Sequence, residues 1–143
     1  MDGASARPGA LAIDLLGKAW ASPTTLIGLI LGLVGHVAGW AMRRRVRISL
    51  GNNAVQFEGN AVAGVSAVTF GNVCLYRGPI CDAAHERQHT YQAQLLGPFY
   101  LPSNFAGGVA ALLLDGFWHG PHNWNETGPL MSPSRPWPGS RPR

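Results

Sequence analysis

Charged side chains are scarce in this sequence. Only 13% of its 143 residues are Asp, Glu, Lys or Arg, whereas about a quarter are charged in a typical soluble domain. Cysteine is scarcer still: Cys74 and Cys81 are the only two, and their spacing excludes a zinc ribbon, which needs close pairs. The basic residues form no stripe interleaved with aromatics, so we predict no nucleic-acid partner. The length is that of one domain.

What the chain does contain is a long apolar run. Residues 23–42 carry no formal charge, and a helix of about 20 residues is long enough to cross the hydrocarbon core. Ser22 and Pro23 are typical of a helix start. A signal peptide fits poorly, because Arg43–Arg45 stand where a small-residue cleavage site would follow. We predict a transmembrane helix over residues 22–42, after an N-terminal segment of residues 1–21, with a buried helix of a soluble protein as the alternative.

The residues in and around this run indicate its partners. Four arginines (Arg43, Arg44, Arg45 and Arg47) follow it closely, so the positive-inside tendency places the C-terminal side in the cytoplasm, against membrane lipid. Four glycines recur inside the run every three or four positions, and small residues at this spacing allow close helix approach. We therefore expect that a homo-oligomer could form through this glycine face. The glycines are Gly28, Gly32, Gly35 and Gly39.

Four short segments between residues 46 and 76 have the pattern of strands. They are VRISL (46–50), AVQFE (54–58), VSAVTF (65–70) and NVCLY (72–76). Polar and glycine-rich turns separate them, with a bend expected at Gly71. We predict a small antiparallel sheet. Cytoplasmic Cys74 and Cys81 should be reduced, with Cys74 serving as a packing residue, and a disulfide between the two is the alternative.

The segment HERQH, residues 85–89, follows the pattern His-Glu-any-any-His. Asp82 resembles an N-cap, and residues 97–98, Gly-Pro, are typical of a helix stop, so the motif should lie on a helix of about fourteen residues. His85 and His89 would then share one face and could both bind a Zn²⁺ ion. Glu86 is offset by one position and could act as the general base that activates water.

A catalytic zinc site usually has three protein ligands. The downstream candidates are Asp115, His119, His122 and Glu126. We choose Glu126, a carboxylate in a polar loop that is far enough along the chain to fold back on the motif helix, although spacing alone allows either ligand type. Gln92 continues the histidine face and could support a ligand or contact substrate. We expect His119 and His122 to have little effect on zinc binding.

The apolar segment after the motif is interrupted by Pro102 and by Gly107–Gly108. Its longest clean run, residues 105–114, is too short to span a bilayer. We predict a re-entrant or interfacial helix here, and a second span that begins near Leu95 is the alternative. The tail, residues 130–143, is basic and rich in Pro and Ser, which is typical of disorder.

The order of these parts resembles that of a group of small bacterial membrane-associated proteins. The resemblance rests on SPTTLIGLILGL, VTFGNVCLYRG, HERQHTYQAQLLGPFYLPS and NWNETGP, and it covers most of residues 22–129. The pattern is also similar to that of gluzincin zinc peptidases, which pair His-Glu-any-any-His with a downstream Glu. The resemblance implies that Glu126 matches the late glutamate and that the membrane is a bacterial inner membrane. Thr127–Pro129 depart from the group's pattern, in which a further acidic residue and Ala are common.

We therefore expect an α+β protein with an N-terminal transmembrane helix, an antiparallel sheet, a zincin-like helix and an apolar helix, with residues 43–129 as the metal domain. The expected function is that of a membrane-anchored zinc-dependent hydrolase acting on peptides. His85, His89 and Glu126 would hold the metal, and Glu86 would act on water. The alternatives are a non-catalytic membrane protein with a structural or metal-binding motif helix, and a module that binds lipid surfaces.

Overall fold

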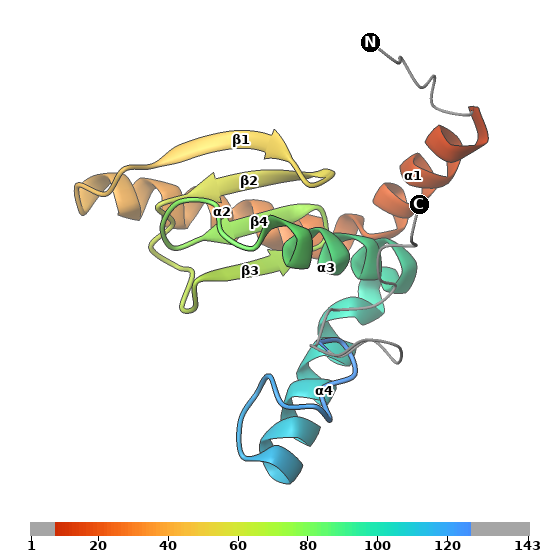
Figure 1. Ribbon diagram of the computed structural model, residues 1–143. Coiled ribbons are helices and arrows are strands. Elements are labelled where there is room, and N and C mark those ends of the chain that lie inside the picture. Colours follow the sequence, from red (N-terminus) through yellow and green to blue (C-terminus); the bar gives the residue numbers. More distant parts are fainter. Residues whose placement is uncertain (1–7, 127–143) are drawn as a thin grey trace.

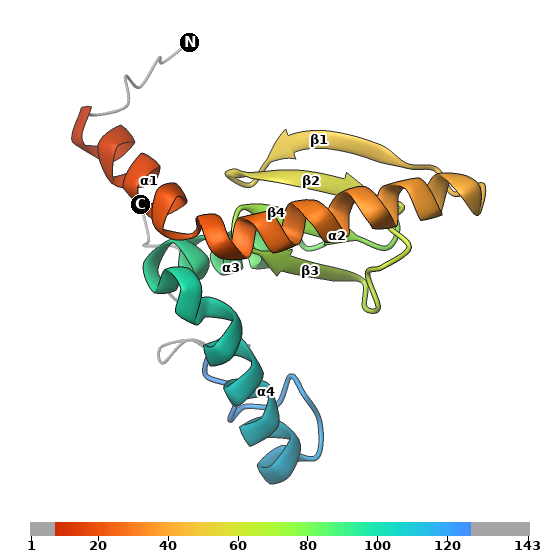
Figure 2. The ribbon, with the colours of Figure 1, turned by 180° about the vertical axis from the view of Figure 1, so that it is seen from behind.

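The structure is a computed structural model that describes residues 8–126 (Figure 1). It is an α+β protein in which α2 lies along one face of a four-stranded sheet and α3 lies on the opposite side (Figures 1 and 2). The elements are α1 (Pro8–Trp20), α2 (Ser22–Ala41), β1 (Arg47–Gly51), β2 (Ala54–Glu58), β3 (Ala67–Phe70), β4 (Val73–Tyr76), α3 (Ala83–Leu96), the 3-10 helix η1 (Gly97–Phe99) and α4 (Tyr100–Asp115). The basic tail and Thr127–Pro129 lie outside the described residues.

The sheet is mixed rather than antiparallel, which corrects the sequence-based prediction. Its strand order is β1-β2-β4-β3, and β2 pairs with β4 in parallel. The cause lies in β4, whose four residues are all buried. Val73 and Leu75 pack with Phe57 and the partly buried residues of α2, while Cys74 and Tyr76 form a second cluster. A strand that is buried on both faces is stable in the centre of a sheet. The position beside β2 is therefore taken by β4, and β3, which comes earlier in the sequence, lies at the edge.

The glycine face of α2 packs against this sheet and not against a second helix. Gly28, Gly32, Gly35 and Gly39 are buried. A Cβ added at Gly32 would lie 2.5 Å from the Phe57 ring, and one at Gly39 would lie 2.4 Å from the Gly59 carbonyl oxygen. The surface that we expected to mediate oligomerisation is therefore covered within the same chain.

Helix α2 is the one helix among residues 8–126 that is long and apolar enough to cross a membrane. Length and composition alone give this result, and signal sequences and core helices of soluble proteins share both properties. Helix α1 lies within the segment 1–21, for which the sequence had predicted no structure. Asp14 of α1 accepts hydrogen bonds from Asn53 and Gln94, so contacts with distant parts of the chain hold α1 in place.

Helix α4 is continuous through the residues that were expected to interrupt it. Pro102 lies in its first turn, where a missing N–H breaks no helical hydrogen bond. Gly107 and Gly108 lie in its middle and are both buried. A Cβ at Gly107 would lie 2.6 Å from Asn123 Oδ1, and one at Gly108 would lie 2.0 Å from the Trp118 ring. The two glycines thus make room for the segment that follows α4.

Candidate metal centre

The motif helix has the predicted bounds, since α3 runs from Ala83 to Leu96. Asp82 occupies the N-cap position, but its side chain makes no capping hydrogen bond and its backbone is left-handed (φ 45°). Its carbonyl oxygen instead accepts the backbone N–H groups of His85 and Glu86. One face of the helix is buried, and Glu86, His89 and Gln92 lie on it.

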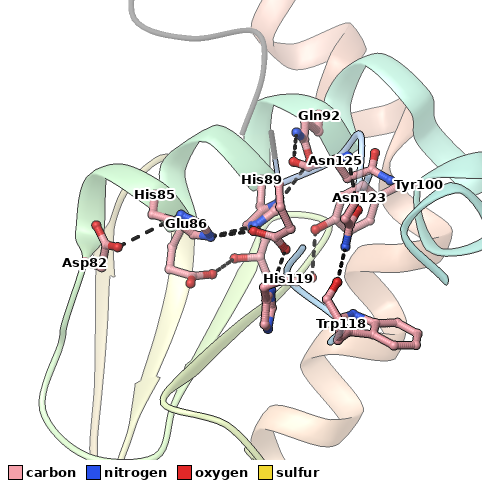
Figure 3. A network of polar contacts seen from close by, with 12 residues as sticks. Asp82, His85, Glu86, His89, Gln92, Tyr100, Trp118, His119, Asn123 and Asn125 are labelled. Carbon is pink, nitrogen blue, oxygen red and sulfur yellow. Dashed lines mark hydrogen bonds and ion pairs between the residues drawn. The ribbon is translucent and has the colours of Figure 1, made fainter. Parts of the chain in front are cut away.

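The two motif histidines and Glu126 lie within contact distance of one another. His85 Nε2 lies 3.0 Å from His89 Nε2 (Figure 3). Glu126 Oε2 lies 3.1 Å from His85 Nε2, and Glu126 Oε1 lies 3.4 Å from His89 Nε2. Donors about 2.05 Å from a tetrahedral zinc ion lie about 3.3 Å from one another. Each nitrogen therefore lies at about this separation from the other nitrogen and from one oxygen of Glu126, and together the three residues could hold a metal ion.

Gln92 orients His89. Its Oε1 lies 2.9 Å from His89 Nδ1, and its Nε2 donates to the carbonyl oxygen of Asn125 at 2.7 Å. Because the second bond fixes which end of the amide faces the ring, Oε1 must accept from Nδ1–H. The Nε2 lone pair of a neutral His89 then points toward His85 and Glu126. A carbonyl oxygen that holds a histidine in this way is a common outer partner of a metal ligand.

The segment that carries Glu126 is clamped against α4 and α3. Asn123 and Asn125 are completely buried, and Glu126 is 6% exposed. Asn125 Nδ2 donates to the Ser103 carbonyl oxygen, and Asn123 Nδ2 donates to that of Trp118. In the sequence this segment is the short run NWNE (123–126), whose two asparagines hold the neighbouring Glu126 in place through these hydrogen bonds.

Electrostatics also favour a charged cluster. Burial acts to raise the pKa of Glu126, but hydrogen bonds from His85 and His89 outweigh it and hold that pKa well below its usual range. Burial acts to lower the pKa of His85, yet its hydrogen bond with Glu126 raises it overall. Without a metal, Glu126 is thus a buried carboxylate whose charge the His85 ring stabilises when it is protonated. A cation in the same place would supply the same balance.

Glu86 is held beside this cluster. Thr69 Oγ1 of β3 donates to Glu86 Oε2 at 2.6 Å. No described residue forms a hydrogen bond with the other oxygen, Oε1. Glu86 lines the same cavity as His85, His89 and Glu126. The cavity has a volume of about 380 Å³, and most of its remaining wall is apolar or aromatic, including Val68, Phe70, Leu101, Phe105 and Trp118. Glu86 therefore lines the cavity with one carboxylate oxygen bonded to Thr69.

Of the other downstream candidates, His119 lies beside the cluster and His122 does not, which the sequence spacing did not show. His119 Nδ1 lies 3.4 Å from Glu126 Oε1, and its exposed side chain lines the cavity. His122 instead pairs with Asp115, 2.6 Å from Nδ1 to Oδ1. His119 is thus a neighbour of the cluster that the sequence-based reasoning had set aside.

The two cysteines are free among the described residues. Cys74 is buried beneath α3, and burial raises the pKa of its thiol to about 11, so it is a packing residue as expected. Cys81 is exposed. Comparisons with protein families, curated proteins and solved structures find no match to this chain.

Proposed function

We propose that the protein is a zinc-dependent hydrolase that cleaves an amide bond, with His85, His89 and Glu126 as the metal ligands. One observation carries the proposal: two Nε2 atoms and a carboxylate converge within 3.4 Å beside a buried glutamate on the same cavity. Two neutral histidines and one carboxylate leave a fourth position of zinc open for water or substrate.

The chain's own residues would divide the work as follows. Zinc, when bound, supplies a Lewis acid that polarises a carbonyl group and acidifies water. Glu86, anchored by Thr69, takes a proton through its free oxygen and returns it to the leaving amine. His119, which lies 3.4 Å from Glu126 Oε1 and is largely exposed, can donate to a substrate oxygen.

A peptide is the proposed substrate, on two grounds beyond the sequence resemblance. The cavity wall accepts a bulky apolar side chain. Strand β3, whose residues line the same cavity, is an edge strand, and extended peptides can add to such an edge. We further propose that the protein works at the cytoplasmic face of a bacterial inner membrane, because anionic lipid there would attract the arginines that follow α2.

The alternative is a metal-binding or structural motif helix without catalysis. The hydrogen bond from Thr69 to Glu86 favours it, because a buried glutamate of purely structural role would make the same contact. The two functions differ in what Glu86 does once metal is bound.

Three variants test the proposal. Glu86→Gln should bind zinc like the wild type and cleave nothing, because an amide cannot accept the proton. His85→Ala and Glu126→Ala should each lower zinc affinity at least about tenfold, since each removes a ligand. Zinc binding would be measured by competition with a chelating dye, and cleavage by mass spectrometry of a proteome-derived peptide library. Equal cleavage by wild type and Glu86→Gln would refute Glu86 as the base, and no cleavage by the zinc-loaded wild type would support the non-catalytic alternative. Tight zinc binding by Glu126→Ala would refute the ligand set.

A further inference from the structure

The face of α2 that points away from the sheet is entirely apolar. Every exposed residue from position 26 to position 42 is hydrophobic, and the large ones are between 43% and 71% exposed. They follow helical spacing on the side opposite to the buried glycines. Figure 2 shows α2 lying over one face of the sheet, with no other helix or strand on its outer side. This outer face consists of Leu26, Ile27, Ile30, Leu33, Val34, Val37, Trp40, Ala41 and Met42.

The inner face is fixed to the sheet along its length. Near the start of α2, the backbone N–H of Asn72 donates to Thr25 Oγ1 at 3.0 Å. In the middle, Asn60 Nδ2 donates to the Gly32 carbonyl oxygen, and the Ala61 backbone N–H donates to that of Gly35. These bonds add to the close glycine contacts. Separation of α2 from the sheet would therefore break these hydrogen bonds and expose the hydrophobic core.

This attachment conflicts with a helix that crosses a bilayer. A crossing α2 would carry the sheet to membrane depth, where the unpaired edges of β1 and β3 would have no water to bind. We propose instead that α2 lies in the plane of a bilayer surface, with the outer face in the acyl boundary and the sheet and metal centre in water. Interfacial helices lie about 5–10 Å deep in this way. The proposal does not depend on zinc or catalysis.

Charge favours lipid over a second copy of the chain as the occupant. Trp40 closes the outer face, and Arg43 and Arg45 follow directly, exposed and without an ion pair to any described acidic residue. Indole rings and arginines are typical anchors at the level of lipid headgroups. The described residues of a second copy would bring few free carboxylates, since Asp14 pairs with Lys18, Glu58 lies 3.9 Å from Arg47, and Asp82 alone among them is largely exposed. Anionic lipid would supply the missing charge.

Vesicle flotation tests the occupant with the full chain. The protein should float with phosphatidylcholine vesicles that contain phosphatidylglycerol, and Arg43→Gln and Arg45→Gln should each weaken this binding about fivefold. Leu33→Glu and Val37→Glu should weaken it roughly tenfold or more. Ile80→Glu, a matched change at an exposed aliphatic residue outside the outer face, should have no effect. Unchanged circular dichroism would show that the variants fold. A soluble dimer that ignores vesicles would overturn the proposal.

Protease protection separates the flat arrangement from the crossing one. A cleavable tag is placed before Met1, and the protein is added to the outside of sealed vesicles. In the flat arrangement both the tag and Cys81 stay outside, so protease removes the tag completely and an impermeant thiol reagent labels Cys81. A tag that becomes cleavable only after detergent is added would show that α2 crosses.

Discussion

At the scale of single residues, Gln92 links the two halves of the candidate metal centre. It accepts from His89 on its own helix and donates to the backbone beside Glu126. Without it, His89 would be free to turn its ring and the carbonyl oxygen of Asn125 would lose a buried donor. The residue was noticed in the sequence because it continues the histidine face, but its bond to a segment more than thirty residues away is a property of the fold.

We predict that Gln92→Leu lowers zinc affinity about 10–100-fold, the usual cost of losing an outer partner of a ligand. The matched control is Gln88→Leu. Gln88 is also buried on the same helix, but its Oε1 accepts no hydrogen bond from the described residues. Chelator competition on both variants checks the prediction, and equal losses would mean that helix packing, not the contact to His89, sets the affinity.

Zinc affinity should also depend on pH through His85. The pKa of His85 is raised above its ordinary value of about 6.5, mainly by Glu126 against the opposing effect of burial. Its charged form stabilises the metal-free protein below that value, and this contribution is lost as the pH rises through the folded pKa. Zinc needs the neutral ring, so binding must release a proton.

We therefore predict that, as the pH is lowered, zinc affinity begins to fall while the pH is still above 6.5. Once His85 is protonated, the affinity falls about tenfold for each further pH unit. Calorimetry in buffers of different ionisation enthalpy would detect the released proton. An affinity that stays constant between pH 6 and pH 8 would contradict the assignment of His85 as a ligand.

At the scale of elements, Gly107 and Gly108 of α4 allow the loop after α4 to pack closely against that helix. We predict that Gly107→Ala lowers zinc affinity about tenfold, because the new methyl group displaces the buried Asn123 side chain and with it the segment that carries Glu126. The helix itself gains up to about 1 kcal/mol from alanine, so the overall stability should change little.

Gly64→Ala serves as the control for this change, since nothing lies within 4 Å of the added Cβ. The comparison uses thermal unfolding together with zinc titration. If Gly107→Ala binds zinc as tightly as Gly64→Ala does, the loop does not depend on close contact with α4.

The elements show which sequence signals were sufficient. The four strands and the motif helix lie within about two residues of their predicted bounds, because alternation, turn residues and the Gly97 stop are local signals. The prediction of an antiparallel sheet was wrong because strand pairing is long-range, and no residue near Val73 indicates that β4 lies between β2 and β3 and is parallel to β2. Helix α1 was not predicted because its stability comes from Asn53 and Gln94. His119 was set aside because loop geometry decides its position.

At the scale of the whole molecule, α2 is part of the core. We predict that a chain beginning at residue 43 does not fold, because the loss of α2 exposes Phe57, Val73 and Leu75. Circular dichroism and gel filtration of the truncated chain would check this. A soluble, zinc-binding fragment would show instead that α2 is a removable anchor.

The position of Glu126 gives the metal a second consequence. Helix α3 and the end of the described chain are joined at one point, so a bound ion closes a loop of about 37 residues between His89 and Glu126. By the chain-entropy argument used for disulfides, such a closure is worth up to about 4 kcal/mol. Unlike a disulfide, this cross-link is reversible and responds to the supply of metal. If the lifetime of the protein in a cell depends on how often this loop opens, that lifetime would then follow the concentration of free zinc.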